Sequence, residues 1–294
     1  MSAPTSLAGF VSAYRKSTSA TLAAIVLLLI LAAALLAPVL SPQDPYDLAQ
    51  LDLLDARLPP GSPSGDGTRQ YLLGTDAQGR DMVSAILYGL RTSLVVGVCA
   101  TLCAVAIGIV VGLVAGYFGG RFDALLMRIV DMQLSFPAIL VALILIAILG
   151  QGVGKVITAL VAAQWAYYAR TIRGVVLVES QREYIAATRV LALPVTSVLF
   201  RHLLPNCMPA LIVVGALQVA SAIALEATLS FLGVGLPITE PSLGLLIANG
   251  FTYLLSGKYW ISFFPGLALL VTIMSINLVA DQLRDVLNPR LRVD

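Results

Sequence analysis

Long apolar runs dominate this 294-residue chain and restrict the folds that it can adopt. Hydrophobic residues make up 59% of the sequence and charged residues only 12%, whereas a soluble globular domain is about 25% charged. Several runs hold about twenty residues, enough for a helix to cross a hydrocarbon core of about 30 Å. Because backbone in lipid must satisfy its own hydrogen bonds, we expect an all-α polytopic membrane protein.

Six transmembrane helices are predicted, at about residues 20–40, 92–117, 133–149, 156–178, 207–229 and 265–279. The first run is too long for a signal peptide and lacks a small-residue cleavage site, so we expect it to be retained. The other predicted segments are a polar N-terminal tail (1–19), an extracytoplasmic segment (41–91), a five-helix core (92–283) and a C-terminal tail (284–294). The core contains a polar interruption at 179–206 and an extracytoplasmic loop at 230–264.

The basic residues predict the orientation of these helices. With the N-terminus in the cytoplasm, twelve of the 18 arginines and lysines fall inside and six outside, as the positive-inside rule expects. Both termini and residues 179–206 are then cytoplasmic. The inside set is Arg15, Lys16, Arg121, Arg128, Arg170, Arg173, Arg182, Arg189, Arg201, Arg284, Arg290 and Arg292; the outside set is Arg57, Arg69, Arg80, Arg91, Lys155 and Lys258.

The polar stretch 182–206 between the fourth and fifth runs predicts two short helices. Ser180 and Glu183 have the spacing of a capping box, which starts a helix near Gln181. Pro194 suits the first turn of a second helix, and Pro205 is expected to end it. Short helices need a surface to lie on, either the membrane or a groove on a cytosolic partner. The predicted apolar face of the first helix is Tyr184, Ile185, Thr188, Leu191 and Ala192.

This stretch resembles the EAA loop, the coupling segment in membrane subunits of ABC importers. The family pattern E-Y-x-x-A-x-R-x-L is matched by Glu183, Tyr184, Ala187, Arg189 and Leu191, and its closing H-x-L-P-N by residues 202–206. Ala186 replaces the usual glutamate and Ala192 the usual glycine, which predicts a less sharp turn between the helices. The resemblance implies contact with an ATPase through Arg182, Glu183, Tyr184, Ala187, Arg189, Leu191, Arg201, His202 and Pro205.

Two further stretches resemble the dipeptide, oligopeptide and nickel branch of these importers. The signature L-G-T-D-x-x-G-R-D is matched at residues 73–81 by Gly74, Thr75, Asp76, Gly79, Arg80 and Asp81. Here Thr75 or Asp76 could cap a helix that runs to about Leu90, and Asp76 and Arg80 have the spacing of a surface ion pair. The family's closing motif is matched by Asn277, Asp281, Arg284, Asp285, Pro289 and Arg290, with Asn288 in place of an aspartate.

Two features inside the apolar runs suggest more specific roles. Gly108, Gly112 and Gly116 form a stripe of small residues, which predicts close helix packing inside this subunit or against a second one. Glu226 is the one ionisable residue of the fifth run. An acid inside a span is a candidate for the translocation path, and a hydrogen-bonded structural role is the alternative.

The resemblance as a whole implies the transmembrane domain of a type I ABC importer in a bacterial inner membrane. Such a permease moves di- or oligopeptides by alternating access and works with a second permease, two ATPase subunits and an extracytoplasmic binding protein. No cofactor is expected in this chain, because Mg-ATP would bind the partner subunits. The stretch 150–155, GQGVGK, lacks the spacing and the Ser or Thr of a phosphate loop, and no nucleophile and base pair stands out, so we expect no enzymatic activity.

Other assignments stay open. The same importer class could carry nickel chelates or haem. An ion-coupled secondary carrier is a second alternative, supported only by Glu226 and Pro137. A structural scaffold is a third, for which a charged helical stretch in the cytoplasm would be an unusual feature. Cys99, Cys103 and Cys207 favour buried thiols over a metal site or a disulfide. No stretch has the charge of a nucleic-acid-binding face.

Overall fold

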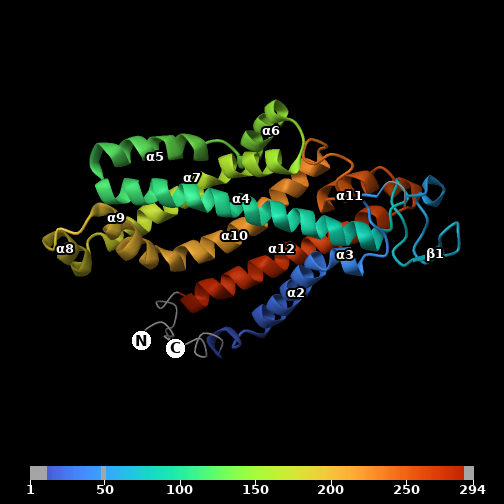
Figure 1. Ribbon diagram of the computed structural model, residues 1–294, viewed down its shortest axis with the longest axis horizontal. Coiled ribbons are helices and arrows are strands. Elements are labelled where there is room, and N and C mark those ends of the chain that lie inside the picture. The colour runs from blue at the N-terminus through green and yellow to red at the C-terminus, as the bar shows by residue number, and fades with distance from the viewer. Residues whose placement is uncertain (1–11, 48–50, 288–294) are drawn as a thin grey trace.

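The computed structural model describes residues 12–47 and 51–287, and nearly all of its regular structure is helical (Figure 1). The α-helices are α2 (Thr18–Leu35), α3 (Ala37–Leu40), α4 (Met82–Phe118), α5 (Gly120–Leu134), α6 (Ala138–Leu149), α7 (Val153–Glu179), α8 (Glu183–Val190), α9 (Val195–Ser197), α10 (Leu204–Phe231), α11 (Leu243–Phe251) and α12 (Trp260–Leu287). The 3-10 helices are η2 (Leu53–Asp55) and η4 (Leu254–Ser256), and η3 (Val198–Leu203) is a π-helix. Strands β1 (Ser62–Pro63) and β2 (Gln70–Tyr71) form a small antiparallel hairpin that pairs Ser62 with Tyr71.

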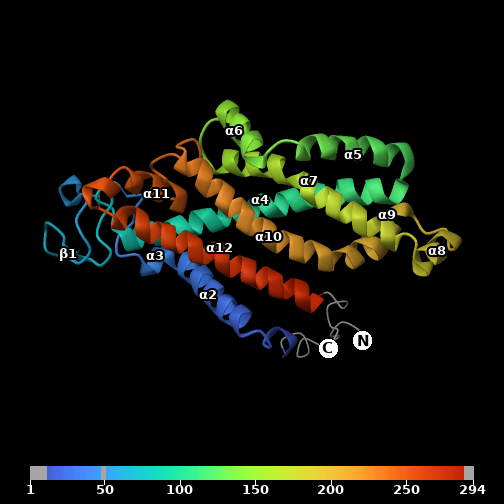
Figure 2. The same cartoon turned by 180° about the vertical axis from the view of Figure 1, so that it is seen from behind.

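The long helices α4, α7, α10 and α12 give the molecule an elongated shape (Figures 1 and 2). Helix α8 lies at one end, and the β1–β2 hairpin lies at the opposite end with α11 nearby. Helix α2 packs against α12, so the first and last long helices are neighbours. The chain therefore presents two separate polar ends joined by apolar helices.

The predicted glycine stripe lies where α4 crosses α7, inside this chain. A Cβ added at Gly112 would lie 2.6 Å from the carbonyl oxygen of Ala169 and 2.7 Å from Cβ of Ile172. One added at Gly108 would lie 2.3 Å from Cβ of Tyr168. Gly116 is equally close to α7, because its Cβ would lie 2.8 Å from side-chain atoms of Val176. These backbones can approach so closely only because α4 carries no side chain there.

The predicted count of six spans stays a prediction. Within the described residues, four helical segments are long and apolar enough to cross a membrane: 18–35, 82–118, 195–231 and 260–287. Most of the predicted third span, residues 133–149, is helix α6, which meets the preceding α5 at an angle of 85° next to Pro137. This pair could count as a fifth span. Helix α7 has 27 residues but is not one of these four segments. Its charged residues Lys155, Arg170 and Arg173 lower its mean hydropathy.

Pro205 does not end a helix, contrary to prediction. It lies in the first turn of α10, and the segment from Val195 to Phe231 is helical throughout. The π-helix η3 ends at Leu203, two residues before the proline, and the amide of Leu204 donates to the carbonyl of Leu199. A π turn is one of the local adjustments that accommodate proline inside a membrane helix. The coupling stretch is therefore continuous with α10.

Two helices extend beyond the spans predicted for them. Helix α4 begins at Met82 rather than near residue 92, so the separate helix expected before Leu90 is the first part of α4. Helix α12 begins at Trp260, and Pro265 lies inside it. Both helices extend into the polar end that contains the β1–β2 hairpin, where Trp260 donates a hydrogen bond to the carbonyl of Thr75 at 3.2 Å. Long-range contacts of this kind extend a helix beyond its apolar run.

Candidate functional site

The predicted coupling segment, residues 179–206, is anchored in the helical core. Its inner face belongs to a cluster that includes Tyr168, Ile172 and Val176 of α7. The two short helices and the start of α10 therefore share one buried cluster with α7. The buried residues of the segment are Ile185, Thr188, Val198, Leu199 and Leu203.

The predicted capping box does not form. Helix α7 continues to Glu179, and the hydroxyl of Ser180 donates to the carbonyl of Leu177 at 3.1 Å. Helix α8 begins at Glu183 without a side-chain cap. The predicted N-cap was wrong because α7 extends further than expected, and Ser180 is its C-cap residue.

A contact that sequence reasoning missed joins the end of α7 to α8. The hydroxyl of Tyr184 donates to the carboxylate of Glu179 at 2.9 Å, and Nε of Arg182 lies 3.8 Å from its other oxygen. Partial burial and this hydrogen bond raise the pKa of Tyr184 to about 12. The tyrosine therefore stays neutral at physiological pH and keeps donating to Glu179.

The turn after α8 is as sharp as a glycine turn, although the expectation from Ala192 was a blunter one. Ala192 has φ = 50°, in the left-handed region. Its amide donates to the carbonyl of Arg189 at 3.0 Å, and the amide of Leu193 donates to Thr188 at 3.1 Å. These two bonds are those of a Schellman motif, which normally places glycine at this position. The alanine thus adopts the strained conformation instead of changing the turn.

The outward face of the coupling segment mixes apolar and cationic side chains. Ala187 is exposed at its centre, with Tyr184 one turn before it and Leu191 one turn after it. Leu191 is 70% exposed and Ala192 is exposed as well, so of the predicted apolar face only Ile185 and Thr188 are buried inside this chain. Among the described residues, none forms an ion pair with Glu183, Arg189 or Arg201, which are all exposed. His202 is half-buried and Pro205 is exposed.

The signature at residues 73–81 forms a tightly wound turn. Gly74 and Gly79 both have φ near +79°, at 79° and 78°. A Cβ at Gly79 would lie 2.1 Å from the carbonyl oxygen of Asp52, and one at Gly74 would lie 2.5 Å from that of Leu58. Glycine is therefore required at both positions by conformation and by space.

The polar residues of the signature are buried and hydrogen-bonded. Thr75 accepts from the amide of Leu58 at 2.8 Å. Asp76 and Arg80 form the predicted pair at 2.7 Å, but each side chain is only 1% exposed, so the pair is not on the surface. Neither Thr75 nor Asp76 caps the helix. Asp81 does so by accepting from the amide of Ser84 at 2.8 Å.

Glu226 is completely buried in α10, at the junction of α4 and α10. Its carboxylate accepts from the hydroxyl of Ser93 in α4 at 2.8 Å and from that of Ser230 one turn further along α10 at 2.7 Å. Both oxygens thus have a protein donor. This arrangement favours the structural alternative over a place on the translocation path.

The closing motif occupies the last turns of α12. Asn277 is half-buried, and Asp281, Arg284 and Asp285 are exposed. Arg284 borders a cavity of about 470 Å³ between α10 and α12. The remaining motif residues, Asn288, Pro289 and Arg290, lie outside the described residues.

The predicted site residues do not form one site. The coupling segment and the signature lie at opposite ends of the molecule (Figures 1 and 2), and Glu226 belongs to neither. Sequence reasoning also missed Gln43, whose side-chain oxygen accepts from the amide of Asp81 at 2.7 Å, and Asp55, which accepts from the hydroxyl of Tyr71 at 2.9 Å. No local pattern marks these contacts, because they join residues far apart in the sequence.

A protein-family model described as the binding-protein-dependent transport system inner membrane component matches residues 108–293. This chain belongs to that family. A second model, the N-terminal TM domain of oligopeptide transport permease C, matches residues 7–60 of the permease. Members of the family are membrane subunits of bacterial ABC importers, which work with ATPases and binding proteins. The permease is thus a transporter component of the inner membrane.

Named relatives cover nearly the whole permease. It is 39% identical over 279 residues to the dipeptide transport system permease protein DppC of Escherichia coli strain K12, covering 95% of this chain and 91% of the relative. It is 35% identical over 289 residues to the di/tripeptide transport system permease protein DppC of Pseudomonas aeruginosa strain UCBPP-PA14, covering 98% and 94%. It is 36% identical over 278 residues to the dipeptide transport system permease protein DppC of Bacillus subtilis strain 168, covering 95% and 84%.

A solved structure shares the fold of the permease. A chain of the MetNI methionine ABC transporter, in a structure of its inward-facing conformations, superposes with a TM-score of 0.57 at 17% identity and covers 69% of this chain and 96% of its own length. The predicted fold class, an all-α transmembrane domain of the type I importer kind, is therefore confirmed.

Proposed function

We propose that this permease moves di- or oligopeptides across the bacterial inner membrane by alternating access. The support for the substrate class is that relatives from three bacteria, similar over most of the chain, are named dipeptide or di/tripeptide permeases. In the proposed complex it pairs with a second, homologous permease and rests on two ATPase subunits, which bind Mg-ATP and hydrolyse it. An extracytoplasmic binding protein delivers the peptide, and both termini of this chain lie in the cytoplasm.

The observation that carries this mechanism is the construction of the coupling segment. Its inner face is packed into the core beside α7, while its outer face leaves Ala187 and Leu191 uncovered at one end of the molecule. An apolar face with flanking arginines suits docking into a groove on a partner protein. Closure of the ATPases would push this face, and the shared core would transmit the displacement to α4, α7 and α10 as a switch between two packed arrangements.

The coupling role is tested by Ala187→Glu. The added carboxylate would be placed between Tyr184 and Leu191, where docking would bury it without a partner. We expect the complex to assemble, whereas peptide uptake and peptide-stimulated ATP hydrolysis fall by about tenfold or more. Co-purification, uptake into proteoliposomes and phosphate release measure the three quantities.

The matched control is Ala124→Glu, an exposed alanine on α5 outside the coupling segment. This variant should keep both activities. Wild-type hydrolysis and uptake in the Ala187→Glu variant would remove the proposed role of the segment.

The substrate class is tested on the cognate binding protein. Thermal-shift measurements with dipeptides, longer peptides, nickel chelates and haem should show stabilisation by peptides, because ligand binding to the folded state raises its free energy of unfolding. Stabilisation by a nickel chelate or by haem alone would replace the proposed substrate with that ligand.

A further inference from the structure

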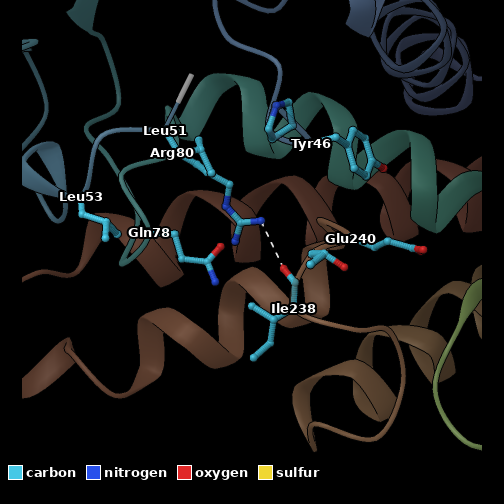
Figure 3. Close-up of a pocket in the computed structure, with 9 residues that line it drawn as sticks. Tyr46, Leu51, Leu53, Gln78, Arg80, Ile238 and Glu240 are labelled. Atoms are coloured by element: carbon cyan, nitrogen blue, oxygen red, sulfur yellow. Dashed lines mark hydrogen bonds between the residues drawn. The ribbon is translucent and has the colours of Figure 1, made fainter. Parts of the chain in front are cut away.

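A cavity of about 560 Å³ lies beside Arg80 of the signature (Figure 3), at the end of the permease opposite the coupling segment (Figure 1). Its walls come from three separate stretches, represented by Tyr46 and Leu53, by Gln78 and Arg80, and by the loop before α11. This volume is within the range of small-molecule sites, about 300–1,000 Å³. The lining is mostly apolar, with a few charged and polar groups.

Arg80 is the first of these charged groups, and its hydrogen-bonding capacity is incompletely used. The side chain is 1% exposed, and its Nε donates to Oδ2 of Asp76. The other oxygen of Asp76 already accepts from the amides of Gln78 and Arg80 at 2.8 and 2.9 Å. Nη1 lies 3.5 Å from the carbonyl oxygen of Ile238, at the limit of a hydrogen bond, and Nη2 has no partner within the part of the chain that the structure describes.

The free edge of this guanidinium is suited to a carboxylate. An unsatisfied buried donor costs about 1–3 kcal/mol, and more when it is charged. The two outer nitrogens of arginine form a planar fork that binds a carboxylate through two parallel hydrogen bonds. Figure 3 shows this edge of Arg80 directed into the space between Gln78 and Ile238. A ligand carboxylate there would satisfy Nη2 and replace the weak bond to Ile238.

Glu240 supplies the opposite charge in the same cavity. Its side chain is half-buried, and it forms no ion pair with any described residue. Figure 3 shows it extending away from Arg80, so the two charges are separated along the cavity. A free carboxylate in this position favours an ammonium group. Leu53 and Ile238 provide apolar surface for the rest of a ligand.

We propose that this cavity binds a short peptide zwitterion, with the peptide carboxylate on Arg80 and its terminal ammonium group at Glu240. The positions of the two charges come from the cavity itself, and the choice of a peptide as ligand rests on the proposed function. The cavity would hold a peptide at the outer end of the permease after release from the binding protein.

The test uses the complete transporter complex in nanodiscs without its binding protein. The probe is radiolabelled L-alanyl-L-alanine, with N-acetyl-dialanine and dialanine amide as competitors that each lack one charge. We expect saturable binding of dialanine, with each competitor about fivefold weaker or more, the effect of losing an ion pair of about 1 kcal/mol. Absence of saturable binding to the wild-type complex would overturn the proposal.

Glu240→Gln is the decisive variant because Glu240 has no structural partner among the described residues. This variant should bind dialanine about fivefold more weakly and N-acetyl-dialanine with unchanged affinity. The preference for a ligand with a free ammonium group would then disappear. Arg80→Lys should likewise remove the preference for a free carboxylate. Asp66→Asn, an exposed carboxylate on the hairpin, is the matched control and should leave both preferences intact. An unchanged preference in Glu240→Gln would overturn the proposal even if Arg80→Lys failed to fold.

Uptake with the binding protein present separates this proposal from the proposed function. Normal peptide uptake by a complex that binds no dialanine removes the cavity site alone. A second outcome is uptake of a nickel chelate or haem but not of peptide, with charge-dependent dialanine binding retained. This outcome would contradict the proposed substrate class but would still support a zwitterion site in the cavity.

Discussion

Ala192 shows how one residue can carry strain that a family pattern avoids. Its φ of 50° is costly for any residue with a Cβ, by roughly 1–2 kcal/mol. The turn is nevertheless kept, because the two Schellman hydrogen bonds and the buried anchors on either side hold both helices in place. The coupling segment therefore keeps the strained left-handed conformation at Ala192 and does not adopt a different turn.

Ala192→Gly should stabilise the coupling segment by about 1 kcal/mol, because glycine adopts this conformation without steric cost. Amide hydrogen exchange of residues 183–193 should slow about fivefold in the intact complex. Ala186→Gly, at an exposed position inside α8, is the control and should accelerate exchange there, because glycine weakens a helix interior. Equal or faster exchange in Ala192→Gly would show that the left-handed turn is not strained.

Glu226 is the second residue whose role depends on its neighbours. Glu226→Gln can keep a hydrogen bond with the hydroxyls of Ser93 and Ser230, so we expect a loss of stability within about 1 kcal/mol and retained uptake. Glu226→Ala leaves both hydroxyls without their acceptor and opens a cavity, which should cost about 3 kcal/mol. Thermal unfolding of the purified complex compares the two. If Glu226→Gln were fully stable but peptide uptake were abolished, the result would support a role of Glu226 in the translocation path.

At the scale of elements, the contact between α4 and α7 depends on the missing side chains of three glycines. Gly112→Ala should destabilise the complex by about 1–3 kcal/mol, because the new methyl group meets the backbone of Ala169 and the side chain of Ile172. Gly174→Ala on α7 is the matched control, since a Cβ there meets nothing within 4 Å. We expect Gly174→Ala to be at least as stable as the parent in thermal unfolding. Equal stability of both variants would mean that α4 and α7 are not tightly packed.

Helix boundaries were the least predictable feature of the elements. The pattern at Ser180 and Glu183 had the spacing of a cap, but α7 extended into it. The cap of α4 lies at Asp81, several residues beyond the two that the local pattern favoured. Gln43 accepts from the amide of Asp81 and so helps to place that residue. Several residues near a helix end can fit the local pattern of a cap, and contacts with distant residues determine which of them caps the helix.

At the scale of the whole molecule, the coupling segment and the signature at residues 73–81 lie at opposite ends of the long helices (Figure 1). This separation predicts their accessibility in cells. Thr68→Cys, on the exposed hairpin, should react with a membrane-impermeant maleimide in intact spheroplasts, whereas Arg189→Cys should react only after permeabilisation. Gel shifts of the labelled chain measure both, with the parent protein as the control for Cys99, Cys103 and Cys207. Labelling of Arg189→Cys in intact spheroplasts would reverse the orientation and exclude contact with a cytoplasmic ATPase.

The sequence by itself determined the class of this protein, the stripe of glycines and the positions of both polar ends. These features follow from composition and from local periodicity, since lipid accepts only helices that satisfy their own backbone. Only the tertiary structure decided that Arg80 is buried beside a cavity and that Ala192 is held in the left-handed region. The place of Arg80 depends on distant residues such as Ile238, and the turn at Ala192 is held by buried anchors that pack against α7.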